Sequence, residues 1–220
     1  MRLFSIIILT ALLCGGIFLG CKGTQARIMH NNELDMVGSN RAGAEIYNPM
    51  VRQATGKLLA EAARGSIQQV SYNTASQAKR RVCFITLENR SMEELGDFKE
   101  HIKMSILEEV SSSEQFEIVS DRAVTAGLRA LSLRPDDLFI TENMRKFTSV
   151  MGRDGTPVDY LLFGTITSGT TEGNRDMQRD YKLSLELVDT QTFSPILVST
   201  PMRKEYNNSV KGKIGNWFKK

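Results

Sequence analysis

The spacing of hydrophobic positions predicts four helices in this chain. The first apolar stripe consists of Val51, Ala54, Leu58 and Ala62. It follows Asn48 and Pro49, a capping residue and a proline suited to a first helical turn, so this helix is predicted to start there and to reach about residue 69. The second stripe consists of Leu95, Phe98, Ile102, Ile106 and Val110. It predicts a helix over residues 92–110, and shorter helices are predicted over residues 121–131 and 141–151.

Strands are predicted where apolar residues run together or alternate with polar ones. Three short segments of this kind are residues 82–87, 116–119 and 160–164. The clearest alternation consists of Tyr181, Leu183, Leu185 and Leu187. It predicts a strand with one solvent-exposed face, whose partner is expected over residues 194–202 after a turn at residues 189–192. The charged stretch at residues 168–180 is predicted to be a long loop.

These elements follow the order α-β-α-β-α-α-β-β-β along the chain. The order predicts an α/β fold of the α+β type, with a single mixed sheet of four to five strands packed with about four helices. The globular domain is predicted to span residues 48–206, and a basic tail follows at residues 207–220. Residues 21–47 are polar and lack proline, which predicts a flexible tether. Fully stretched, this tether would reach roughly 80 to 90 Å.

The first twenty residues have the parts of an export signal, with a basic start, an apolar run and small residues before a cysteine. The run is shorter than the roughly 20 apolar residues of a spanning helix, so a cleaved signal over residues 1–20 is predicted. The stretch Phe18-Leu19-Gly20-Cys21 is similar to a lipobox, whose cysteine receives lipid, including palmitate. A lipobox usually has Leu at the position of Phe18, and an ordinary cleaved signal with an accidental cysteine is the alternative. Lys22 after the cysteine favours the outer membrane, by resemblance to proteobacterial sorting.

Charge and cysteine usage narrow the class of protein further. The chain has 28 Lys and Arg against 25 Asp and Glu, and removal of the signal takes away Arg2, leaving a balance of +2. Such a mixed surface gives no reason to expect nucleic acid as a partner. With Cys14 lost in the signal and Cys21 lipidated, Cys83 is alone in an apolar segment and is predicted to lie in the core.

The sequence contains few candidates for catalytic or metal-binding residues. His30 and His101 have no Cys, His or carboxylate at ligand spacing, so no metal site is predicted. Phosphate-loop, dinucleotide-binding and nucleophile-elbow motifs do not occur in the sequence. The adjacent pairs Glu93-Glu94 and Asp136-Asp137 are interpreted as solvated helix starts. These observations predict a protein that is not an enzyme and that takes no cofactor and no small-molecule substrate.

Several stretches carry a resemblance to a known family when taken in chain order. They are the opening helix at residues 50–59, Glu88-Asn89-Arg90-Ser91, Phe116-Glu117-Ile118-Val119, and residues 159–166 and 181–189. Behind a lipobox, this series resembles the LpoB family of penicillin-binding-protein activators, lipoproteins whose domain is related to the N-terminal domain of TolB. The resemblance covers residues 50–206.

The resemblance implies an outer-membrane lipoprotein, anchored at Cys21 and facing the periplasm. It would bind a bifunctional class A penicillin-binding protein and activate it in peptidoglycan synthesis, without a reaction of its own. Family members that are well studied have a long proline-rich tether, from which this chain departs, and the resemblance assigns no interface residues.

Two other functions are kept as hypotheses. The short tether favours a structural or scaffold lipoprotein that uses the same TolB-like fold in another envelope complex. The third hypothesis is a hydrolase assembled from Asp136, Asp159 and Asp189, which would require carboxylates facing each other across a pocket.

Overall fold

The structure is a computed structural model that describes residues 41–69, 79–153, 157–173 and 176–207, with residues 29, 33, 34 and 37. The chain divides into two compact units, Met1–Leu34 and Asp35–Lys220, and the fold belongs to the second. Cys21, His30 and the tail after Asn207 lie outside the described residues. Among the described residues, no helix combines the length and apolar character that crossing a membrane requires.

The second unit contains four α-helices, one 3-10 helix and five strands within the described residues. In chain order they are α2 (Ala44–Gln69), β1 (Arg80–Arg90), α3 (Phe98–Ser111), β2 (Phe116–Ile118), α4 (Asp121–Ala130), η1 (Pro135–Phe139), α5 (Thr141–Met151), β3 (Tyr160–Glu172), β4 (Asp176–Asp189) and β5 (Pro195–Asn207). The strands form one sheet in the order β2-β1-β3-β4-β5. β1 pairs in parallel with β2 and β3, whereas β4 pairs antiparallel with β3 and β5. The predicted fold class and element order are confirmed.

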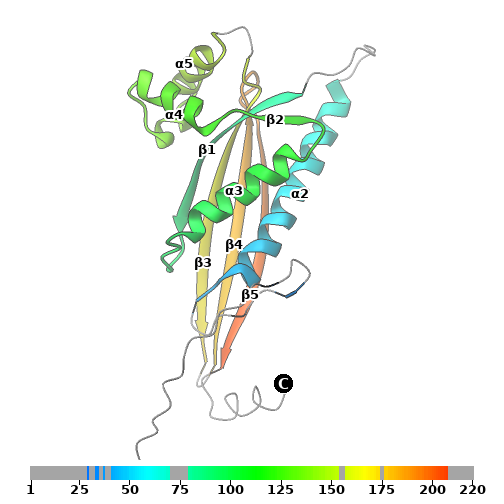
Figure 1. Ribbon diagram of the computed structural model, residues 1–220, viewed down its shortest axis with the longest axis vertical. Coiled ribbons are helices and arrows are strands. Elements are labelled where there is room, and N and C mark those ends of the chain that lie inside the picture. The colour runs from blue at the N-terminus through cyan, green and yellow to red at the C-terminus, as the bar shows by residue number, and fades with distance from the viewer. Residues whose placement is uncertain are drawn as a thin grey trace, which may run out of the picture. The chain divides into compact units, whose positions relative to one another are not determined.

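Helices cover the two faces of this sheet unequally. α2 and α3 lie over one face, and their apolar stripes pack on the sheet in the larger core, which includes Leu58, Ile102 and Leu183. α4, η1 and α5 cover the other face only at one end of the strands (Figure 1), where a smaller core includes Leu138, Phe147 and Phe163. Cys83 lies in this smaller core with no exposed surface, as predicted, and burial raises the pKa of its thiol to about 12.

On the second face, no helix in the described part of the chain covers the sheet beyond Phe163; we call this part of the face bare. The side chains of β3, β4 and β5 that follow on that side are polar or charged, apart from Pro201, and are half-buried or exposed. They include Thr165, Thr167, Lys182, Ser184, Pro201 and Arg203. An antiparallel sheet tolerates one solvated face when polar residues line it, so this half of the sheet needs no third layer.

The predicted start of the first helix at Asn48 and Pro49 is wrong. α2 begins at Ala44, so Pro49 lies inside the helix. The extra turn is stabilised because Ile46 and Tyr47 are buried in the larger core, at 5% and 1% exposure. Tertiary burial outweighs the local preference of proline for a first turn.

The predicted loop at residues 168–180 is also wrong. β3 and β4 stay paired from Tyr160 and Asp189 out to Glu172 and Met177. The charges that suggested a loop have partners in the structure, because Arg179 bonds to Glu93 and Arg203 bonds to Asp180.

The predicted helix at residues 92–110 starts later than expected, since α3 begins at Phe98. Residues 91–97 form a loop in which the Asn89 side chain accepts from the Ser91 amide at 3.0 Å and donates to the Glu93 carbonyl at 2.8 Å. Gly96, at a positive φ of 54°, lets this loop turn into the helix.

β5 is an edge strand with a blocked edge. Lys57 of α2 donates to the Ser199 carbonyl oxygen at 3.4 Å, so the peptide group of Ser199 faces away from β4. Pro201, two residues further on, shares that side, and its missing N–H therefore falls on the unpaired edge, where a proline costs no sheet hydrogen bond.

Candidate functional site

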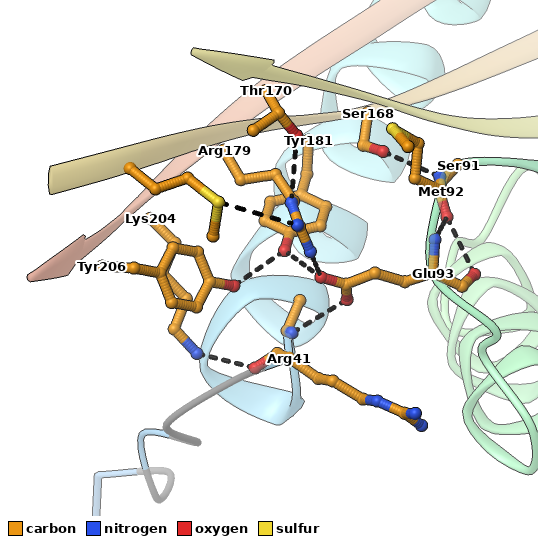
Figure 2. Close-up of polar contacts among 12 residues, drawn as sticks. Arg41, Ser91, Met92, Glu93, Ser168, Thr170, Arg179, Tyr181, Lys204 and Tyr206 are labelled. Carbon is orange, nitrogen blue, oxygen red and sulfur yellow. Dashed lines mark hydrogen bonds and ion pairs between the residues drawn. The ribbon is translucent and has the colours of Figure 1, made fainter. Parts of the chain in front are cut away.

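Glu93 is the centre of the most extensive buried polar network in the described part of the chain. It was interpreted as a solvated helix start, which is wrong, because its exposed fraction is 8% and it lies in the loop before α3. Its Oε1 accepts hydrogen bonds from the Arg179 guanidinium and, at 2.7 Å, from the Tyr181 hydroxyl. Its Oε2 accepts from the Ala42 amide at 3.0 Å. Figure 2 shows these groups converging on the carboxylate from β4 and from the chain just before α2.

A second buried ion pair lies beside the first. Lys204 of β5 donates to Glu45 Oε1 and to the carbonyl oxygen of Arg41, both at 2.7 Å. The side chains of Lys204 and Glu45 are 8% and 11% exposed. Tyr206 contacts both pairs, because its hydroxyl lies 3.0 Å from that of Tyr181 and Lys204 Nζ lies 5.2 Å from the centre of its ring.

We call Glu45, Glu93, Arg179, Tyr181, Lys204 and Tyr206 the entry clamp, because they hold the chain where it enters α2. Two of the clamp's contacts are made to backbone groups, the amide of Ala42 and the carbonyl of Arg41. Backbone contacts of this kind fix the path of the chain whatever side chains it carries. The clamp therefore fastens the entering segment to the sheet and to the loop before α3.

The protonation of the clamp is set by its surroundings. Burial alone would raise the pKa of the Glu93 carboxyl, but hydrogen bonds from Tyr181, Ala42 and Arg179 and the charge of Arg179 lower it below 4.5 overall. Burial, followed by the bonds to Tyr206 and Glu93, raises the pKa of Tyr181 well above its ordinary value. At neutral pH Glu93 is therefore ionised and Tyr181 is a neutral donor. Since Tyr181 gives its proton to Glu93, Tyr206 must donate to the oxygen of Tyr181.

A pocket of about 320 Å³ lies beside the clamp and is lined by residues 41, 42, 47 and 93–98. Its lining includes the rings of Tyr47 and Phe98, 5.7 Å apart, and the carboxylate-bearing Glu93, Glu94 and Asp97. This mixed, charged lining differs from the mostly apolar pockets that hold small-molecule ligands. The pocket is thus a polar recess next to the entering chain.

Two of the three carboxylates of the hydrolase hypothesis have structural roles. Asp159 accepts from the Arg81 amide at 2.7 Å, and Asp189 accepts from the amides of Gln191 and Thr192 at 2.8 and 2.7 Å, which closes the turn before β5. Asp136 is exposed in the first turn of η1. Its neighbour Asp137 accepts from the Arg134 amide at 2.7 Å, which agrees with its interpretation as a helix-start residue.

We next consider His101 and the possible metal ligands among the described residues. His101 is exposed on α3, and its ring lies edge-on to Phe98 with centroids 5.7 Å apart. No group of three or more His, Cys, Asp or Glu side chains that could hold a metal ion occurs in the described part of the chain.

A family model described as the peptidoglycan-synthase activator LpoB matches residues 49–194, about two thirds of the chain. The chain belongs to the LpoB family. Membership confirms the resemblance that the strand motifs suggested. The match contains Glu93, Arg179 and Tyr181 of the clamp, whereas Glu45, Lys204 and Tyr206 lie outside it. The LpoB family is one of activators of peptidoglycan synthesis, and the family-level role of this chain is activation of a synthase.

Solved structures give further similarities. The LpoB C-terminal domain from Escherichia coli is 17% identical, with a TM-score of 0.45, covering 72% of this chain and 97% of that domain. The NMR structure of E. coli LpoB is 14% identical, with a TM-score of 0.44, covering 84% of this chain and 81% of that one. Lipoprotein GNA1162 from Neisseria meningitidis is 17% identical, with a TM-score of 0.43, covering 64% and 93%. No curated protein sequence matches the chain.

Proposed function

We propose that this protein is a lipid-anchored outer-membrane lipoprotein that binds a bifunctional class A penicillin-binding protein from the periplasmic side and activates it. The observation that carries the proposal is the match of about two thirds of the chain to the family of peptidoglycan-synthase activators. The structural roles of Asp159 and Asp189 support a role by binding, without a reaction of the protein's own.

Activation by binding needs no catalytic residue in the activator. The protein must bind the active conformation of the synthase more tightly than the inactive one, and the ratio of the two affinities limits the activation. A rigid domain held at a defined point suits this task. The entry clamp provides such a point, because it fixes the chain at Arg41 and Ala42 directly before α2.

The synthase assay tests the proposal directly. Purified full-length protein is added to a class A penicillin-binding protein from the same organism, and glycan polymerisation and peptide cross-linking are measured. We expect both a saturable complex and a rate increase that follows its formation. A synthase that neither binds the protein nor changes its rates would overturn the proposal.

The lipid anchor is tested by labelled palmitate in cells. The wild-type chain is expected to incorporate label and Cys21→Ala to incorporate none. Cys83→Ala is the matched control, because Cys83 is buried in the smaller core and cannot be an acceptor while the domain is folded. Label that persists in Cys21→Ala would contradict lipidation at Cys21.

One observation favours the alternative of a scaffold lipoprotein in another envelope complex. The clamp holds Arg41 and Ala42, so the tether cannot extend to residue 47 as predicted from sequence. Twenty residues separate Cys21 from Arg41 and can span at most about 70 Å. Cells that lose the protein and keep normal wall incorporation, but leak at the outer membrane, would favour this alternative.

A further inference from the structure

Two large apolar side chains are exposed side by side where η1 meets α5. Phe139 is 56% exposed and Ile140 is 58% exposed. The Phe139 ring stacks on Phe163 of β3, with centroids 5.1 Å apart and planes 29° apart. The backbone is held on both sides, since the Ile140 amide donates to Asp137 and its carbonyl accepts from Met144. Both side chains are therefore presented on a rigid backbone, which lowers the ordering cost of binding.

A third exposed apolar residue lies in the cross-strand row that contains Phe163. In this row Phe163 of β3 pairs with Glu186 of β4, and Glu186 pairs with Leu197 of β5. Leu197 is 66% exposed on the second face, because its neighbour Val198 is buried on the first. Two strand spacings place Leu197 about 10 Å from Phe163. We call Phe139, Ile140 and Leu197 the ledge, at the boundary between the helix-covered and the bare parts of this face.

The ledge lies far along the strands from the entry clamp. Arg179 of the clamp donates to Thr170 of β3 at 3.2 Å, whereas the ledge stacks on Phe163 of the same strand. Thr170 is seven positions after Phe163, which corresponds to about 23 Å at about 3.3 Å per residue. Figure 1 shows α4 and α5 at the end of the sheet opposite to the start of α2.

The position of the clamp decides which end of the domain lies away from the point where the chain enters it. The clamp fastens the chain at Arg41 and Ala42, directly before α2. The ledge lies at the other end of the strands and is therefore remote from that point. If Cys21 carries the lipid, as the proposed function has it, a synthase that approaches from the side opposite to the anchor would meet the ledge first.

We infer that the ledge is the docking surface for the peptidoglycan synthase, which would supply an apolar pocket for Phe139 and Ile140. This inference rests on the proposed function and assigns the surface that performs it. Exposed apolar residues grouped on a rigid element are typical of binding sites, and a central aromatic side chain often dominates the affinity.

The test measures the affinity of the full-length protein for a purified class A penicillin-binding protein. The variants are Phe139→Asp and Ile140→Asp, and the matched control is Met104→Asp, since Met104 is 55% exposed on α3 at the other face. We expect each ledge variant to bind about 30-fold more weakly or worse, and the control to stay within about twofold of the wild type. Circular dichroism melts of all three variants check that the fold is retained, and Ile140→Asp serves if Phe139→Asp unfolds.

The possible outcomes show whether the inference alone fails or whether the proposed function fails with it. Wild-type affinity in both folded ledge variants overturns the inference and leaves the proposed function intact. A wild-type protein that binds no synthase overturns the proposed function and the inference with it. Self-association of the wild type that Phe139→Asp abolishes, with synthase binding unchanged, assigns the ledge to a second copy of this chain and also overturns the inference.

Discussion

The two ends of the sheet depart from the usual distribution of polar and apolar groups in opposite ways. At the entry clamp, the charges of Glu93 and Lys204 are buried, each 8% exposed. At the ledge, Phe139 and Ile140 are more than half exposed. A buried charge is tolerated only where ion-pair and hydrogen-bond partners satisfy it. In the clamp, these partners include the backbone of the chain that enters α2. The contrast indicates that one end of the domain holds its own chain and the other is available to a partner.

Glu93→Ala breaks the clamp and is expected to have the largest effect on stability. It leaves Arg179 and Tyr181 largely buried without their acceptor, which should lower the free energy of unfolding by about 3 to 5 kcal/mol. Urea denaturation measures this loss. The control is Glu94→Ala, the exposed neighbouring carboxylate, which should stay within about 0.5 kcal/mol of the wild type. Equal losses in the two variants would refute the central role of Glu93.

Gly127→Val disturbs the ledge end and leaves the clamp intact. A Cβ at Gly127 would lie 2.6 Å from Met151 Sδ and 3.1 Å from Phe147 Cε2, so the Met151 side chain must move and the buried Phe147 ring must shift. Overpacking of this kind costs about 1 to 3 kcal/mol. Amide exchange should increase in α4 and α5 but not at Ile46 and Tyr47.

A valine at Gly56 is the matched control for this substitution. A Cβ at Gly56 meets nothing within 4 Å, and valine favours a helix more than glycine does, so no loss of stability is expected there. Faster exchange at the clamp in Gly127→Val would show that the two ends are coupled.

Acid should weaken the clamp by protonating Glu93. The folded-state pKa of Glu93 is lowered below 4.5, so its contribution is complete above pH 4.5 and is lost as the pH falls through the folded value. The wild type should therefore lose stability more steeply than Glu93→Gln as the pH falls below 4.5. Denaturant midpoints of the two proteins across this range measure the difference. Parallel pH profiles would contradict the assignment.

The smallest loss of stability is expected from a substitution on the bare part of the second face. Arg203 and Asp180 form an ion pair at 2.9 Å whose side chains are 77% and 44% exposed. Such a pair is screened by water and salt, so Arg203→Ala should cost at most about 0.5 kcal/mol. A larger loss in urea denaturation would show that this ion pair stabilises the bare face appreciably.

Much of the fold could be predicted from the spacing of apolar residues within single segments. The alternation from Tyr181 to Leu187 predicted the core of β4, and the helical stripe around Ile102 and Ile106 predicted most of α3. These predictions succeed because burial of one face is a periodic property of a single segment. The hairpin was predicted too short because Arg179 and Asp180 suggested solvent, whereas the paired strands continue through both.

The clamp was not predicted, because its partners are far apart in the chain. Glu93 and Arg179 are separated by 86 residues, and nothing near Glu93 indicates a buried carboxylate. One signal was present in the alternation itself. Arg179 shares the face of Tyr181 and Leu183, so extending that face by one step places a charge among buried side chains. A charge in that place predicts a buried counter-charge, although not which residue supplies it.

Pro201 has a consequence for many copies of this chain held on one membrane. Lipid-anchored molecules would share a two-dimensional surface, where collisions between edge strands are more frequent than in dilute solution. An unprotected edge strand is a template for pairing with a neighbour and, repeated, for fibril growth. Two features interrupt this template at the middle of β5. Pro201 has no N–H to donate, and the Ser199 carbonyl already accepts from Lys57. Crowded copies would therefore stay separate, each with its ledge exposed.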